Sequence, residues 1–128
     1  MKRDTSDLDE QWGARLRRAR LASALSQRKL GVDIGLDESA ANARINRYET
    51  GVHRPDLLTV SRIADVLGIP VAYFYADTDE LADLIYRYGR ASAAMQKSVK
   101  KLLADIPGLK PKNPLNHSKD KTRKKKYS

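Results

Sequence analysis

The residues between Ser39 and Arg47 combine planar hydrogen-bonding side chains with a small apolar one. An arginine such as Arg47 can donate two hydrogen bonds to guanine O6 and N7. An asparagine, here Asn42 or Asn46, can pair with adenine N6 and N7, and the methyl group of Ala43 can contact a thymine methyl. We therefore treat a set of five residues as candidates for contacting DNA bases: Ser39, Asn42, Ala43, Asn46 and Arg47.

These side chains can act together only if a helix presents them on one side. At about 100° per residue, Ala41, Ile45 and Tyr48 gather on one face, and the candidate base contacts lie opposite or beside it. Gly51 fits the position just after a helix end. The pattern predicts a helix over residues 38–50 whose apolar face docks on the protein. Its polar face is then free for a DNA major groove, which is wide enough to admit a helix.

Apolar spacing and capping residues predict further helices, and no strand-like alternation appears. Ser26 is a typical N-cap before a short helix, and Pro70 is tolerated in a first helical turn. Asp77 or Thr78 can cap a sixth helix, which we expect Gly89 to interrupt. The other expected helices span residues 9–25, 27–34, 56–67, 71–75, 77–88 and 91–106.

Composition argues against several kinds of site. The chain has no cysteine and two widely separated histidines, His53 and His117, so we expect no metal site and no cofactor. No apolar run approaches the ~18–20 residues of a membrane span, and the N-terminus lacks the apolar segment of a secretory signal. No nucleophile–base pair or glycine-rich phosphate loop can be assembled. We expect a cytoplasmic protein that is not an enzyme.

Two short helices joined by a tight turn and followed by more helices form the helix-turn-helix plan. From about Trp12 to Tyr75 the chain resembles the Cro/phage-repressor (XRE-type) helix-turn-helix family, through LRRARLASALSQRKLG, RINRYETG and RPDLLTVSRIADVLGIPVAYFY. Between Gly35 and Ile45 the chain is longer than the family pattern by about four residues, roughly one helical turn. Either the third helix begins one turn earlier or the turn before it is longer.

The resemblance implies roles for individual residues. It implies base contacts for Asn42, Ala43 and Arg47, and a flanking contact for Arg44. Gln27 matches a phosphate-contacting position, and a helix N-terminus such as the one it occupies also suits an anion on physical grounds.

The basic loop after the third helix carries His53 and Arg54, where DNA phosphates are usually met. Arg28 is either a plain surface charge or another phosphate contact. The resemblance also implies that Arg20 and Glu49 form a structural pair. The residues expected to have structural roles are Arg20, Ile45, Tyr48 and Glu49.

The chain divides into four expected segments. Residues 1–8 form a flexible N-terminus, residues 9–76 the helix-turn-helix domain, and residues 77–106 a helical extension that is a candidate for dimerisation. Residues 107–128 hold eight Lys/Arg and one Asp, whereas residues 1–106 hold 17 Lys/Arg and 15 Asp/Glu. Because this basic tail has almost no apolar residues to bury, we expect it to be disordered.

The sequence thus predicts an all-α, lambda-repressor-like domain of five helices with additional C-terminal helices. The expected function is a sequence-specific regulator of transcription that binds double-stranded DNA, a Cro/CI-like repressor of bacterial or prophage origin. Two copies on a palindromic operator are expected. The alternative is an antitoxin-like or adaptor module that binds a protein partner through residues 76–128, with DNA binding secondary.

Removing residues 107–128 should make DNA binding less sensitive to salt without changing the preferred sequence. Each basic side chain that no longer neutralises a phosphate makes the slope of log K against log salt concentration shallower by about 0.9. Titrations of the full chain and the truncated chain at several salt concentrations measure this slope. An unchanged slope, or a changed preferred sequence, would contradict a purely electrostatic tail.

Overall fold

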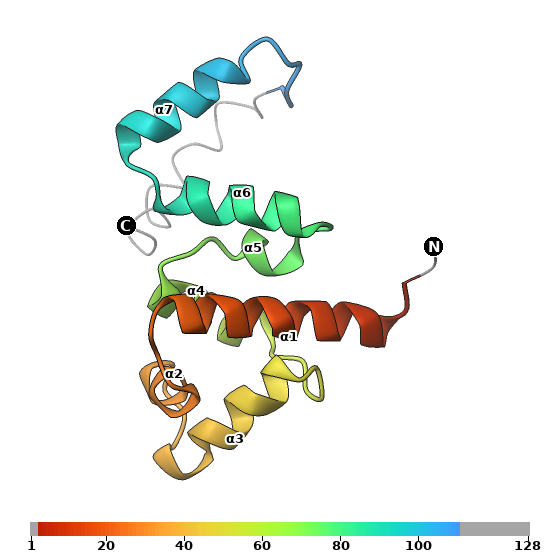
Figure 1. Cartoon of the computed structure of the whole chain (residues 1–128), viewed down its shortest axis with the longest axis vertical. Helices are drawn as coiled ribbons and strands as arrows, with labels where there is room; N and C mark the ends of the chain where they lie inside the picture. Colours follow the sequence, from red (N-terminus) through yellow and green to blue (C-terminus); the bar gives the residue numbers. More distant parts are fainter. Residues whose placement is uncertain (1–2, 111–128) are drawn as a thin grey trace. The chain divides into compact units, whose positions relative to one another are not determined.

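The computed structural model describes residues 3–110 of the 128-residue chain. Within this range there are seven α-helices and no β-strand, which confirms the all-α prediction. In Figure 1, α1 lies between α2 and α3 on one side and α5 and α6 on the other. The helices are α1 (Thr5–Ala22), α2 (Gln27–Asp33), α3 (Glu38–Glu49), α4 (Leu57–Leu67), α5 (Ala72–Tyr75), α6 (Asp79–Arg90) and α7 (Ala93–Leu102).

The start of α1 differs from the prediction. The helix begins at Thr5 and not at Asp9, so residues 5–8, expected within a flexible N-terminus, are helical. The reason is a cap: the Asp4 carboxylate accepts a hydrogen bond of 3.0 Å from the backbone N–H of Asp7. Such a cap satisfies one of the free N–H groups at a helix start.

The turn between α1 and α2 also begins earlier than expected. α1 ends at Ala22 and not at Leu25, and Ala24 adopts a φ of 56°, which a continuing helix does not allow. The expected cap of α2 is present, because Ser26 Oγ accepts a hydrogen bond of 2.9 Å from the backbone N–H of Lys29.

α1 and α3 meet backbone to backbone at Gly13. A Cβ atom on this residue would lie 2.6 Å from the carbonyl oxygen of Tyr48 and would also collide with the carbonyl oxygen of Glu49. Only a residue without a side chain permits so close an approach. Gly13 therefore fixes the C-terminal end of α3 against the middle of α1.

α2 and α3 are packed just as closely. A Cβ atom on Gly31 would lie 2.6 Å from the Cβ of Ala41, so the absence of a side chain lets the two helices touch. The connection between them is short, residues 34–37, with Gly35 at a φ of 95°. Since α3 begins at Glu38, most of the stretch between Gly35 and Ile45 is helical, and the connection itself is only residues 34–37.

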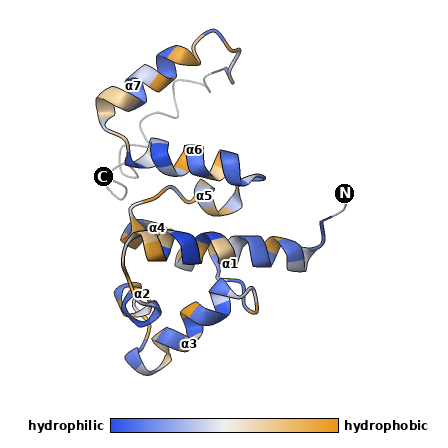
Figure 2. Cartoon of the chain, viewed as in Figure 1, coloured by the Kyte–Doolittle hydropathy of each residue, from blue (hydrophilic) through white to orange (hydrophobic). Residues whose placement is uncertain are grey.

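One apolar core joins the helices of the helix-turn-helix region to α5 and α6. Trp12 of α1 stacks on Phe74 of α5 with ring centroids 4.9 Å apart, and Tyr73 is buried beside them. Figure 2 shows apolar residues concentrated on α4, while α3 is largely hydrophilic. The largest fully buried side chains are Phe74, Leu16, Leu30, Ile45, Ile63 and Val60.

Arg15 joins α1 to the region where α5 ends and α6 begins. Its buried guanidinium donates hydrogen bonds to the carbonyl oxygens of Ala76 and Phe74, and lies 3.5 Å from the Asp79 carboxylate. In return the hydroxyl of Tyr73 donates a hydrogen bond of 3.2 Å to the Arg15 carbonyl. α6 is therefore part of the same compact unit as α1–α5, which extends to residue 90 and not to residue 76.

Gly89 does not interrupt the sixth helix, contrary to the prediction. α6 continues to Arg90, and a Cβ atom on Gly89 would collide with the ring of Pro70. The glycine is thus explained by packing and not by a helix end.

α7 lies in a second unit, which begins at residue 91. Ser92 Oγ caps it by accepting a hydrogen bond of 3.1 Å from the backbone N–H of Met95. The helix ends at Leu102 and not at residue 106, and turns occupy residues 103–105. Proline disfavours a helical conformation in the residue before it, which here is Ile106. Residues 107–110 are exposed and have no regular secondary structure, and residues 111–128 of the expected disordered tail lie outside the described range.

Gly13→Ala should lower the free energy of unfolding by about 1–3 kcal/mol or more, because the added methyl group must displace backbone atoms of α3. Denaturant unfolding measures the effect. Gly108→Ala is the control, since no atom lies within 4 Å of a Cβ at that position. Equal stability of the two variants would contradict the close contact between α1 and α3.

Candidate nucleic-acid interface

α3 separates buried from exposed residues along its whole length. Ala41, Ile45, Tyr48 and Glu49 are buried, and all other residues of the helix are exposed. The exposed face includes all five residues predicted to contact bases: Ser39, Asn42, Ala43, Asn46 and Arg47. The helix therefore presents amide, hydroxyl and guanidinium groups outward while its apolar side holds it on the core.

An ion pair shielded from water anchors the end of this helix. Arg20 Nε donates a hydrogen bond of 2.5 Å to Glu49 Oε2, and Arg20 Nη2 donates one of 3.0 Å to Glu49 Oε1. Arg20 Nη1 also donates to the carbonyl oxygen of Leu25 at 2.8 Å, so one guanidinium joins α1, the following turn and α3. The two side chains are only 9% and 3% exposed, which makes this pairing structural.

Gln27 links the start of α2 to the exposed face of α3. Its amide nitrogen lies 3.1 Å from Asn46 Oδ1 and 3.1 Å from Glu49 Oε1 and donates to both. The residue predicted to contact phosphate is thus in contact with a residue predicted to contact a base. The Asn46 side chain keeps its N–H groups and the second lone pair of Oδ1 for an outside partner.

The first turn of α3 is held by neighbouring polar groups. Ser39 Oγ donates a hydrogen bond of 2.6 Å to Asp37 Oδ2, although Asp37 makes no side-chain cap to the helix backbone. Arg28 of α2 forms an exposed ion pair with Glu38. Two of the predicted DNA contacts, Ser39 and Arg28, therefore already have partners within the protein.

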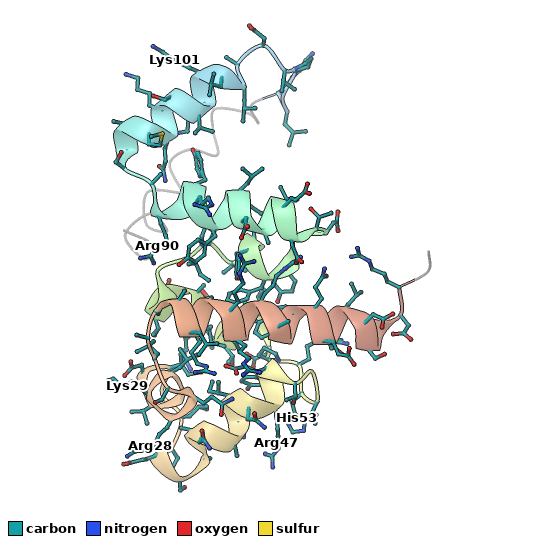
Figure 3. All side chains as sticks on the ribbon, viewed as in Figure 1. Arg28, Lys29, Arg47, His53, Arg90 and Lys101 are labelled. Carbon is teal, nitrogen blue, oxygen red and sulfur yellow. The ribbon has the colours of Figure 1, made fainter. Side chains whose placement is uncertain are left out.

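Two arginines of α3 remain available. Arg44 and Arg47 are exposed, and neither side chain has a hydrogen-bond or ion-pair partner among the described residues. Figure 3 shows Arg47 pointing away from the body of the domain. Exposed, unpaired guanidinium groups on one helix suit the recognition of base edges and phosphates.

The loop after α3 turns sharply and keeps close to that helix. Gly51 has a φ of 79°, and the backbone N–H groups of Val52 and His53 donate to the carbonyl oxygen of Arg47 at 3.0 and 3.2 Å. In Figure 3, His53 lies near Arg47 at the end of α3. The imidazole is exposed and adds a hydrogen-bonding group beside the candidate base contacts.

Arg54, another predicted phosphate contact, is paired with an acidic residue. Its Nε and Nη2 atoms donate hydrogen bonds of 2.9 and 3.1 Å to the two carboxylate oxygens of Asp9. The pKa of Arg54 is raised above its usual value by these hydrogen bonds and by the negative charge of Asp9. Sequence reasoning missed Asp9, because nothing in a pattern along the chain indicates a contact between residues so far apart.

Two features are absent from the described part of the chain, a cluster of metal-ligating side chains and a membrane-spanning helix. No group of three or more His, Cys, Asp or Glu residues that could hold a metal ion occurs within residues 3–110. Across the same residues, no helix has both the length and the apolar character needed to cross a membrane.

Comparison with known proteins points to one protein class. A helix-turn-helix family model, HTH_3, matches residues 16–74. Proteins of Sinorhizobium medicae (strain WSM419) and Rhizobium meliloti (strain 1021), each named an uncharacterized HTH-type transcriptional regulator, are 30% identical to this chain over 76 residues. The matched region is 59% of this chain and 52% of each relative, so the chain spans about half the length of the curated relatives it matches.

A solved structure extends the similarity beyond the helix-turn-helix region. The crystal structure of the transcriptional regulator BswR matches this chain with a TM-score of 0.70 and 37% sequence identity. The match covers 73% of this chain and 93% of that chain. It is therefore longer than residues 16–74 alone.

Glu49→Ala should lower the free energy of unfolding by about 3–5 kcal/mol, because it leaves the Arg20 guanidinium buried without its counter-charge. Glu38→Gln, which disrupts the exposed pair with Arg28, is the control and should cost less than about 1 kcal/mol. Denaturant unfolding compares the two variants. Similar small losses in both would contradict a structural role for the buried pair.

Proposed function

Because the chain belongs to the XRE-type helix-turn-helix family, we propose that it is a sequence-specific transcriptional regulator that inserts α3 into the major groove of double-stranded DNA. The observation that carries the proposal is the division of α3 into a buried face and an exposed face rich in hydrogen-bonding groups. The buried pair of Arg20 and Glu49 supports it, since a helix that reads bases must be held rigidly.

The exposed face supplies the chemistry of base recognition. Arg47 donates two hydrogen bonds to a guanine, and Asn42 or Asn46 pairs with an adenine. Ala43 contacts a thymine methyl group, and the Ser39 hydroxyl serves as donor or acceptor once it leaves Asp37.

A second set of residues meets the DNA backbone. Arg44 and His53 are exposed and can bind phosphate directly. Gln27, Arg28 and Arg54 have protein partners in the free chain, so phosphate contact requires them to share or exchange those partners. Such contacts fix the position of the protein on the duplex but carry no base information themselves.

The regulator acts as a homodimer in the cytoplasm, on a palindromic operator whose half-sites lie about 34–36 Å apart. Occupancy of a promoter then represses transcription by excluding polymerase. Residues 77–106 supply the dimer contact in this proposal. Leu84, on the exposed side of α6, supports it, because 65% of that residue is exposed.

Protein binding through residues 76–128 is the second candidate function, favoured by the character of α7. Its apolar residues Met95 and Leu102 are 57% and 82% exposed. A partner that copurifies with the full chain, and is lost when residues 76–128 are deleted, would favour this function over DNA binding.

Arg47→Ala should weaken binding to the preferred duplex by about 1–3 kcal/mol and relax discrimination at one base pair. Competition among duplexes that differ at single base pairs measures both effects. Arg62→Ala is a matched control, since this exposed arginine belongs to α4 and lies outside the residues proposed for DNA and dimer contacts. Unchanged discrimination in Arg47→Ala would remove this residue from the base contacts.

A further inference from the structure

The ion pair between Arg54 and Asp9 joins the loop that follows α3 to α1. Both carboxylate oxygens of Asp9 accept from Arg54, so the guanidinium is engaged in a two-pronged contact. The Arg54 side chain is 63% exposed, whereas that of Asp9 is 23% exposed. The cation thus faces solvent from a loop beside α3, and the anion lies behind it.

Backbone packing holds these two residues together. A Cβ atom on Gly51 would lie 3.1–3.2 Å from backbone atoms of Asp9 and Glu10, so the loop rests directly on α1. One turn further along α1, Gly13 contacts the backbone of Tyr48 and Glu49, which holds the end of α3 against the same helix. The carboxylate is therefore placed beside the loop by the fold and does not depend on a flexible segment.

A carboxylate and a phosphate bind a guanidinium in the same way, each through two oxygens in one plane. The Nε and Nη2 donors of Arg54 cannot bind Asp9 and a DNA phosphate in this way at the same time. The compact unit has no surplus charge to offset the competition, because residues 1–90 contain 14 Lys/Arg and 14 Asp/Glu. The charges of Arg54 and Asp9 therefore affect how strongly this loop attracts the DNA backbone.

We propose that Asp9 competes with DNA phosphate for Arg54 and so limits the affinity of this loop for the DNA backbone. The inference rests on the proposed function, since it requires that α3 and its loop meet DNA. Asp9 acts through Arg54 and has no contact with DNA itself. Its effect is on affinity and salt dependence, while base preference belongs to α3.

Asp9→Asn in the full chain tests this proposal, with a short duplex of mixed sequence as the probe. The variant should bind more tightly than the wild type. The slope of log K, where K is the binding constant, against log salt concentration should be steeper by about 0.9, the value for one additional phosphate contact. Between about 50 and 200 mM salt this makes its loss of affinity roughly threefold larger than that of the wild type. Unchanged or weaker binding would overturn the proposal and make Asp9 a residue that positions Arg54.

Two controls separate this competition from other effects. Asp7→Asn removes the same charge from the first turn of α1, and no ion pair of Asp7 exists among the described residues. An equal gain in Asp7→Asn would overturn the proposal in favour of general electrostatics. Asp9→Asn should have no effect in an Arg54→Ala background, and a gain that persists there would also overturn it. Failure of the wild-type chain to bind any duplex would instead refute the proposed function.

Discussion

The buried ion pair between Arg20 and Glu49 is the interaction on which the rest of the interface depends. Two charges with little access to water are tolerated only when each satisfies the other, so removing either one is costly. This requirement holds the end of α3 against α1, and the additional bond from Arg20 to the Leu25 carbonyl includes the turn before α2. The exposed face of α3 is then fixed relative to the whole unit.

Two glycines also hold α3 in place. Gly13 and Gly31 bring α1 and α2 into direct contact with α3, so α3 cannot shift without clashes.

Residues 1–90 carry no net charge, and the formal charge of +9 comes from residues 91–128, which hold 11 Lys/Arg and two Asp. In the proposed function, residues 1–90 bind DNA mainly through hydrogen bonds and local charges, and the basic residues 91–128 are proposed to add attraction that does not depend on sequence.

Much of this could be predicted from patterns along the chain, and the exceptions have a common cause. The spacing of Ala41, Ile45 and Tyr48 predicted the buried face of α3, because helical periodicity is a local property. The partners of Arg28 and Arg54 were not predicted, since pairing depends on how separate helices cross. Gly89 was misread for the same reason: its neighbour Pro70 is distant in sequence, and a glycine that serves packing resembles one that ends a helix.

Selection of the full chain on a random pool of duplexes tests the central claim, that the exposed face of α3 reads DNA bases. We expect the retained duplexes to share a consensus with two symmetric half-sites about 34–36 Å apart. A consensus with one asymmetric site would keep base reading and contradict the dimer. No enrichment by a correctly folded protein would contradict the central claim and favour protein binding through residues 76–128.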